Sequence, residues 1–234
     1  MLNKLFKKKA ELTETQKSML RDLCMFFEKN QELFMTEINS QKDKKEIIKQ
    51  IYKRLNYSDY PVLEKSQELF KNSATKIYRG ISADSNELLN DYINSFIYGE
   101  PFYGGRASIY GTGIYTVLGN DINVAKDYAS DGGTNNCGIV IESVLFNDSK
   151  VIESQQIESI RTVLFEKIRK MYPNQIENYL NILKDDGALS SILGYDAIYV
   201  EEKKYIVVLN RKKMIVNSNL LNCFNEKFEN YSKR

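Results

Sequence analysis

The residues best suited to approach a ligand lie in one glycine-rich stretch, residues 104–129. Gly111 and Gly113 flank Thr112, so the backbone can bend sharply there and come close to a ligand without intervening side chains. A short strand of β-branched and aromatic residues, 114–117, is predicted to leave this turn. Taken alone, the glycines favour an ordinary turn that feeds a strand over a ligand-binding loop. Their surroundings must decide between the two.

The composition excludes several classes of reaction. The chain has no histidine, which rules out Ser-His and Cys-His nucleophile pairs, imidazole general bases and His-ligated zinc. We expect Asp185 and Asp186 to lie at a helix end in a solvent loop and to bind no metal, because a metal site needs more oxygen ligands at close spacing than this pair offers. The three cysteines are odd in number and far apart, which favours a reducing compartment over a disulfide framework. We therefore expect a cytoplasmic protein, in the producing cell or in a target cell.

Length and charge limit the partners. A chain of 234 residues that is 42% hydrophobic and 27% charged is predicted to form one globular domain of catalytic size. Its net charge of +2 is too small to attract nucleic acid through bulk electrostatics, which favours a protein as macromolecular partner. No window of about 20 apolar residues predicts a membrane span.

Helical periodicity dominates residues 1–74. Apolar residues recur at helical spacing over 14–39, with a break at Asn30, and again over 42–55. A third helix is predicted from Pro61 to Phe70, with Pro61 in its first turn. We expect this region to pack on the core that follows, and either to brace the sheet or to recognise a target.

Strands interrupted by helices follow over residues 75–216. Strands are predicted at 76–81, 114–117, 138–146 with 151–152 as its continuation, 197–200, 205–209 and 214–216, and helices at 87–97, 122–129, 157–171 and 173–183, the last of which ends at 185–187. Strand pairs joined by short turns favour an α+β fold with a mixed, mostly antiparallel sheet. Residues 217–234 are predicted to form a C-terminal helix.

Three features follow one another along the chain. They are Tyr78-Arg79-Gly80 on the first strand, residues 111–116 with the helix that follows, and residues 194–198 leading into 205–209. Their order and spacing resemble the ADP-ribosyltransferase superfamily, especially bacterial and phage mono-ADP-ribosyltransferases, over roughly residues 76–216. The resemblance implies the split β-sheet core of that family, and NAD as substrate.

The resemblance also implies a role for each matched residue. Arg79 would hold the NAD phosphate or ribose, because a guanidinium fork can bind a pyrophosphate bidentately. Gly80 would let the cofactor lie against the backbone, and Gly111 and Gly113 would admit it. Tyr115 would stack on nicotinamide.

Two further side chains complete the cofactor pocket that the resemblance implies. The hydroxyl of Thr116 would lie near the nicotinamide ring. Tyr128, on the helix that follows, would supply a second aromatic face, or would pack in the core through its helical spacing from Val124 and Ala125.

The catalytic carboxylate is where the chain departs from the family. ADP-ribosyltransferases carry a glutamate at the start of the last core strand, where it stabilises an oxocarbenium-like transition state. Lys204 or Tyr205 occupies that position here, and the nearest carboxylates are Glu201 and Glu202 in the preceding turn. One of these two carboxylates acts in catalysis, or both belong to a charged hairpin tip.

The sequence thus predicts an NAD-dependent mono-ADP-ribosyltransferase that modifies a macromolecule and releases nicotinamide. Two alternatives stay open: an NAD glycohydrolase, and a catalytically silent fold of this family that binds a partner protein. The Lys- and Asn-rich composition is typical of an AT-rich bacterial or phage genome. Such a source suits a bacterial effector or toxin, or a phage-encoded modifier.

Overall fold

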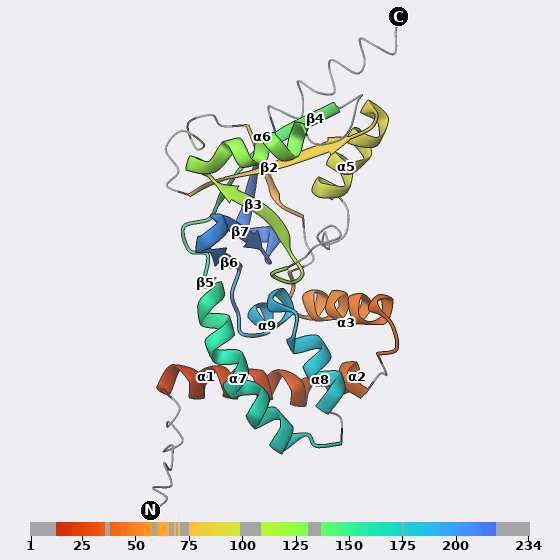
Figure 1. Cartoon of the computed structure of the whole chain (residues 1–234), viewed down its shortest axis with the longest axis vertical. Helices are drawn as coiled ribbons and strands as arrows, with labels where there is room; N and C mark the ends of the chain where they lie inside the picture. Colours follow the sequence, from red (N-terminus) through yellow and green to blue (C-terminus); the bar gives the residue numbers. More distant parts are fainter. Residues whose placement is uncertain are drawn as a thin grey trace, which may run out of the picture.

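The computed structural model describes residues 13–35, 38–57, 60–65, 68, 70, 75–98, 109–130, 137–174 and 176–218. Their centre is a mixed eight-stranded sheet in the order β1-β8-β4-β2-β3-β7-β6-β5, with helices on both faces (Figure 1). The strands are β1 (Val62–Glu64), β2 (Lys76–Ala83), β3 (Ile114–Leu118), β4 (Cys137–Leu145), β5 (Val151–Glu153), β6 (Ala197–Val200), β7 (Tyr205–Val208) and β8 (Met214–Asn217). Only the two edge strands pair in parallel with their neighbours. The predicted α+β class with a mostly antiparallel sheet is confirmed.

Both edges of the sheet correct the prediction. The helix expected from Pro61 to Phe70 is wrong, because Val62–Glu64 forms β1 and pairs in parallel with β8. Residues 151–152 do not continue β4 either, since β5 pairs with β6 at the opposite edge. Both errors have one cause: a short strand is defined by a partner far away in the sequence, which local periodicity does not reveal.

The helices follow their expected periodicity closely. They are α1 (Glu14–Lys29), α2 (Gln31–Met35), α3 (Gln41–Arg54), α5 (Asn86–Tyr98), α6 (Ile122–Ser130), α7 (Ser154–Met171), α8 (Ile176–Leu183) and α9 (Asp186–Ile192). The break at Asn30 is confirmed, since this residue is the C-cap of α1. The helix expected through Leu183 does end there, as α8. The prediction missed that another helix follows at once, since Asp185 is the N-cap of α9 and accepts a hydrogen bond from the backbone of Ala188.

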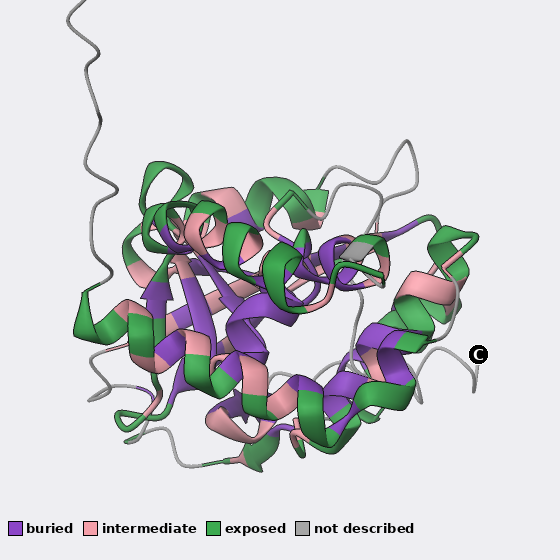
Figure 2. Ribbon diagram, turned by 90° about the horizontal axis from the view of Figure 1, so that it is seen from below, coloured by how far each residue is buried: buried purple, intermediate pink, exposed green. Residues whose placement is uncertain are grey.

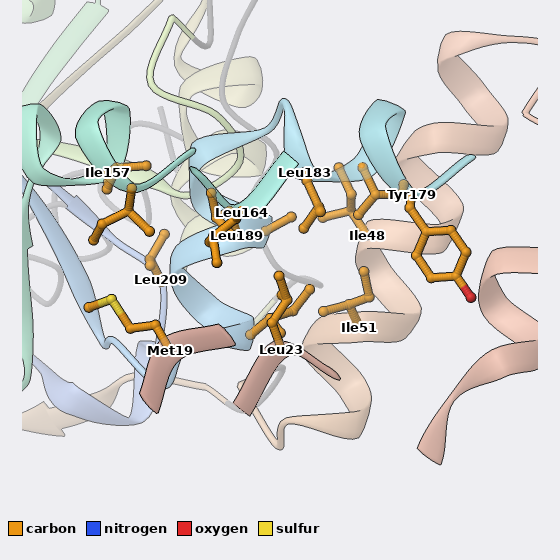
Figure 3. Packing of buried hydrophobic residues seen from close by; sticks show 14 of the residues in the cluster. Met19, Leu23, Ile48, Ile51, Ile157, Leu164, Tyr179, Leu183, Leu189 and Leu209 are labelled. Carbon is orange, nitrogen blue, oxygen red and sulfur yellow. The ribbon is translucent and has the colours of Figure 1, made fainter. Parts of the chain in front are cut away.

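Two hydrophobic clusters lie on opposite faces of the sheet. One joins α5 to the sheet through residues such as Ile77, Leu89 and Phe96. The larger one joins α1–α3 and α7–α9 to the other face through Val207 and Leu209. Buried residues follow the strands and the inward sides of these helices (Figure 2), and α1, α3, α7, α8 and α9 all contribute to the larger cluster (Figure 3). We call α1–α3 with α7–α9 the helical layer.

The helical layer spans the boundary that the sequence suggested at residue 74. Helices from both sides of that boundary share one core, and β1, which precedes it, adds a strand to the sheet. The region 75–216 therefore contains most of the sheet together with half of the helical layer. Of the C-terminal helix expected over 217–234, all but the first two residues lie outside the described part, and Asn217 ends β8.

Candidate active site

The three features that carry the resemblance lie on neighbouring strands. β2 carries Arg79, β3 carries Tyr115, and the hairpin between β6 and β7 carries Glu201 and Glu202; β2, β3 and β7 are consecutive in the sheet. A direct contact joins the first two, because Nη1 of Arg79 donates to the carbonyl oxygen of Tyr115 at 2.9 Å. The contact is to the backbone only: the Arg79 side chain packs on Phe96 at the α5 face, whereas the Tyr115 side chain packs with the cluster of the helical layer on the opposite face.

Arg79 lies on the α5 side of β2. Its Cζ is 5.8 Å from the centre of the Phe96 ring, a cation–π contact. Burial lowers the pKa of the guanidinium to about 10, so Arg79 is still charged at neutral pH. Both of these contacts are made inside the fold, and a ligand that meets Arg79 would have to compete with them.

Gly80 faces the opposite side of β2, where α6 crosses the sheet. A Cβ atom at Gly80 would collide with the carbonyl oxygen of Ala125, and one at Gly138 on β4 would collide with that of Ala129. These two glycines let the backbone of α6 lie directly on the sheet. The close approach that we expected at Gly80 is thus made by α6, and the contact between Gly80 and a cofactor stays a prediction.

The turn at residues 111–113, which we call the 111–113 turn, packs against α9 and β7. Gly111 has φ +79°, a left-handed conformation that glycine adopts without strain. A Cβ on it would collide with the first residues of α9, and one on Gly113 would lie 2.6 Å from Cγ1 of Val207. The space beside both glycines is therefore filled by the chain's own segments. Admission of a cofactor there also stays a prediction.

Tyr115 closes this turn with its hydroxyl group. The hydroxyl donates to the carbonyl oxygen of Gly111 at 2.8 Å and accepts from the backbone N–H of Tyr110 at 3.0 Å. Burial raises the pKa of Tyr115 to about 12, and the charge of Asp185 adds to this shift. The ring therefore has a fixed position and stays neutral. Thr116, next along β3, donates its hydroxyl to the carbonyl oxygen of Ile206 at 2.7 Å.

Tyr128 and Tyr205 extend the aromatic surface beyond Tyr115. Tyr128 is 54% exposed, so its alternative role in the core is wrong. Its hydroxyl lies 3.3 Å from that of Tyr205. The pKa of Tyr205 is raised to about 12, mainly by this hydrogen bond and secondly by burial. The tyrosines at 110, 115, 128 and 205 thus lie together, and of these only Tyr110 was not singled out from the sequence.

Glu201 and Glu202 lie in the short 3-10 helix Glu201–Lys203, and both are exposed. The tip closes through Lys204, whose φ is 53°, and the carbonyl oxygen of Lys204 accepts from the N–H of Leu118 at 3.0 Å. The tip therefore lies beside Leu118, at the end of β3, which is also the strand that carries Tyr115. Both carboxylates are accessible to a ligand at that end of the sheet.

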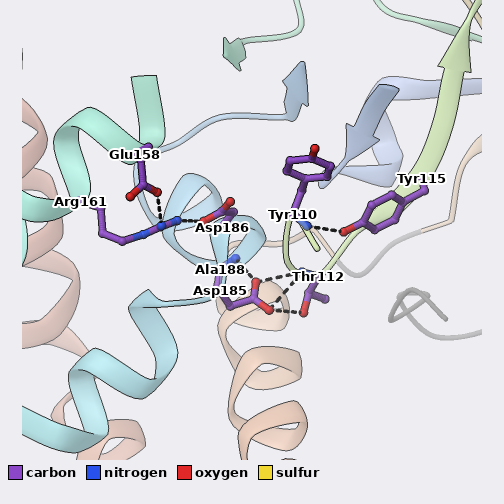
Figure 4. A network of polar contacts seen from close by, with 8 residues as sticks. All are labelled: Tyr110, Thr112, Tyr115, Glu158, Arg161, Asp185, Asp186 and Ala188. Atoms are coloured by element: carbon purple, nitrogen blue, oxygen red, sulfur yellow. Dashed lines mark hydrogen bonds and ion pairs between the residues drawn. The ribbon is translucent and has the colours of Figure 1, made fainter. Parts of the chain in front are cut away.

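The most connected polar residue near the candidate site is Asp185, which we had placed in a solvent loop. That expectation is wrong: Asp185 is buried, and its carboxylate accepts from the N–H and the hydroxyl of Thr112 (Figure 4). The rule that Asp commonly caps helices would have been the signal. Beside it, Asp186 pairs with Arg161 of α7. Asp196 has a structural role, since its carboxylate accepts from the backbone N–H of Lys150 and from the side-chain amide of Asn210.

Two features are absent from the described residues. No group of three or more Asp, Glu or Cys side chains in that part of the chain is placed to hold a metal ion. None of the helices described there is long and apolar enough to cross a membrane.

Comparisons with known proteins add no relative. No family model, no curated protein and no solved structure matches the chain significantly.

Proposed function

We propose that this protein is an NAD-dependent mono-ADP-ribosyltransferase with a protein acceptor. One observation supports the proposal above all others: the three features that resemble the family in sequence lie on three consecutive strands, β2, β3 and β7. The pairing of β3 with β7 connects residues about ninety positions apart, for example Tyr115 with Val207. Local sequence patterns do not require this adjacency, and a shared NAD site would need it.

The reaction needs a stabilised ribosyl cation. The glycosidic bond between the ribose C1′ and the nicotinamide nitrogen breaks, and its electron pair leaves with nicotinamide. A nucleophile of the acceptor then bonds to C1′ and loses its proton. In this proposal Tyr115 and Tyr128 face the nicotinamide ring, and Arg79 holds the phosphate or ribose after leaving its contact with Phe96 on the other face of β2. Glu202 or Glu201 stabilises the cation from the hairpin tip.

The test is incubation of the full chain with NAD labelled in its ADP-ribose part, in the presence of a lysate. We expect labelled protein and free nicotinamide. Glu202→Gln and Glu201→Gln, each with unchanged folding, should show which carboxylate acts through a rate loss of about 100-fold or more. Glu158→Gln on α7, an exposed glutamate that pairs with Arg161, is the matched control and should retain the rate. Folded protein that yields neither product would refute the proposal.

A second candidate is a silent fold that binds a partner protein. It is favoured by the contacts of Arg79, whose guanidinium is buried against Phe96 and bonded to the backbone of Tyr115. The same incubation separates the candidates, because a silent fold would consume no NAD. Free ADP-ribose without labelled protein would instead indicate a glycohydrolase.

A further inference from the structure

Asp185 connects two distant parts of the chain. Its Oδ1 accepts from the backbone N–H of Thr112 at 2.9 Å and from that of Ala188 at 2.8 Å, and its Oδ2 accepts from the Thr112 hydroxyl at 2.9 Å. Asp185 is 8% exposed and Thr112 is 6% exposed. Buried carboxylates are stable only when such bonds satisfy them. One side chain thus caps α9 and holds the 111–113 turn.

A second residue of the helical layer holds the same turn. The hydroxyl of Tyr52, on α3, donates to the carbonyl oxygen of Thr112 at 2.8 Å, and Tyr52 is 1% exposed. The N–H, the hydroxyl and the carbonyl of Thr112 are therefore all bonded to residues of the helical layer and its caps. Residues of α3 and of the α9 cap thus hold this turn in addition to the Tyr115 hydroxyl of its own strand.

When the 111–113 turn is held in this position, it fixes the position of the Tyr115 side chain. The Tyr115 hydroxyl bonds at one end to the carbonyl of Gly111, the neighbour of Thr112, and at the other to the N–H of Tyr110. If Thr112 were released, the acceptor on Gly111 would move with it. The position of the Tyr115 ring then depends on a carboxylate that does not touch the ring.

We propose that Asp185 is a positioning residue of the candidate site: through Thr112 it holds the 111–113 turn and thereby fixes Tyr115 to receive a ligand ring. This inference takes the ligand, NAD, from the proposed function. It also makes the helical layer necessary for ligand binding, because Asp185 is the N-cap of α9.

Asp185→Asn separates the two tasks of this side chain. Asparagine is as good an N-cap as aspartate, so its oxygen can still accept from Ala188 and preserve α9. Its amide group takes the place of Oδ2 and cannot accept from the Thr112 hydroxyl as the carboxylate does, so this bond is lost or must reverse its direction. The retained oxygen can still accept from the N–H of Thr112, but without the negative charge that strengthens the bond. The substitution therefore weakens the hold on the turn while leaving the helix start capped.

The other variants are chosen in the same way. Thr112→Val removes the hydroxyl donor with little change of shape, and Thr112→Ser retains it. Asp186→Asn is the matched control, because Asp186 is adjacent in sequence but pairs with Arg161 instead of the turn. Any general weakening of this junction should appear in Asp186→Asn as well.

The first measurement needs no ligand: amide hydrogen exchange of the full chain, residue by residue. In Asp185→Asn and Thr112→Val we expect amides 110–115 to exchange about tenfold faster or more, as loss of a hydrogen bond of roughly 1.5 kcal/mol implies. Amides of α9 should keep their protection, and Asp186→Asn and Thr112→Ser should resemble the wild type. Equal exchange in Asp185→Asn and Asp186→Asn, or opening of α9 together with the turn, would overturn the inference.

The second measurement is NAD affinity of the same variants by calorimetry. We expect about tenfold weaker binding for Asp185→Asn and Thr112→Val, in proportion to the opening of the turn, and unchanged binding for the other two. Equal affinity in all variants despite a loosened turn would refute the positioning role. If the wild type itself binds no NAD, the proposed function fails, and the exchange measurement alone decides whether Asp185 positions the turn.

Discussion

The side chain of Tyr115, which follows the 111–113 turn, bonds through its hydroxyl to Tyr110 and Gly111, where the turn begins. In Tyr115→Phe the carbonyl of Gly111 and the N–H of Tyr110 lose their partner in a half-buried position. We expect the free energy of unfolding to fall by about 1–3 kcal/mol, the usual cost of leaving buried polar groups unsatisfied. Urea denaturation measures this change.

Tyr199→Phe is the control for this substitution. The Tyr199 hydroxyl only accepts from the Lys204 amino group, at 3.4 Å and near the surface. Its removal should change stability by less than about 0.5 kcal/mol. Equal losses in the two variants would mean that the Tyr115 hydroxyl does not hold the turn.

The ionisation of Tyr115 makes stability depend on pH at the alkaline end. Burial raises its pKa in the folded protein from 10.0 to about 12. The neutral form is thus favoured in the folded state, so the stabilisation is fully present below pH 10 and is lost as pH rises through about 12. The free energy of unfolding should decline across this window more steeply in the wild type than in Tyr115→Phe. Urea denaturation on both sides of pH 10 tests this, and parallel curves would contradict it.

At the scale of the element, α6 can cross β2 and β4 closely because Gly80 and Gly138 have no side chains. Gly80→Ala would push a Cβ into the carbonyl of Ala125, so either the helix or the strand must move. We expect a loss of about 1–3 kcal/mol, typical of overpacked interiors, measured as a lower denaturation midpoint. Gly119→Ala is the control, because the nearest atom to its Cβ would be that of Lys76, at an ordinary 3.4 Å. If both variants are equally stable, α6 can shift at no cost.

The elements also show how far the sequence could be interpreted. Helical and alternating patterns located most helices and the inner strands, because amphipathic spacing reflects which face is buried. They missed β1, whose partner Ile215 lies more than 150 residues away, and α9, whose start is marked only by Asp185. The residues of the candidate site were found as separate motifs. That Arg79 contacts Tyr115, and that Asp185 holds Thr112, depends on tertiary packing that spacing alone does not encode.

At the scale of the whole molecule, the shared core predicts that the helical layer and the sheet unfold together. Phe27 of α1 is fully buried and lies 4.7 Å, between ring centres, from both Phe34 and Tyr179. Phe27→Ala should cost about 3–5 kcal/mol and lower one single transition. Amide exchange should show α8 and α9 losing protection along with α1. Loss of protection in α1 and α2 alone would mean that the first helices form a separate unit.

The order of strands in the sheet also affects how the chain can fold during synthesis. β4, β2 and β3 are made early, but their outer neighbours β8 and β7 come from residues 205–217. Until those residues leave the ribosome, both sides of this three-stranded sheet have unpaired backbone groups, which are sites for aggregation. Contacts this far apart in sequence also form slowly. The protein therefore completes its fold only after nearly all of this chain has been synthesised, and a chaperone that shields strand edges would increase its yield.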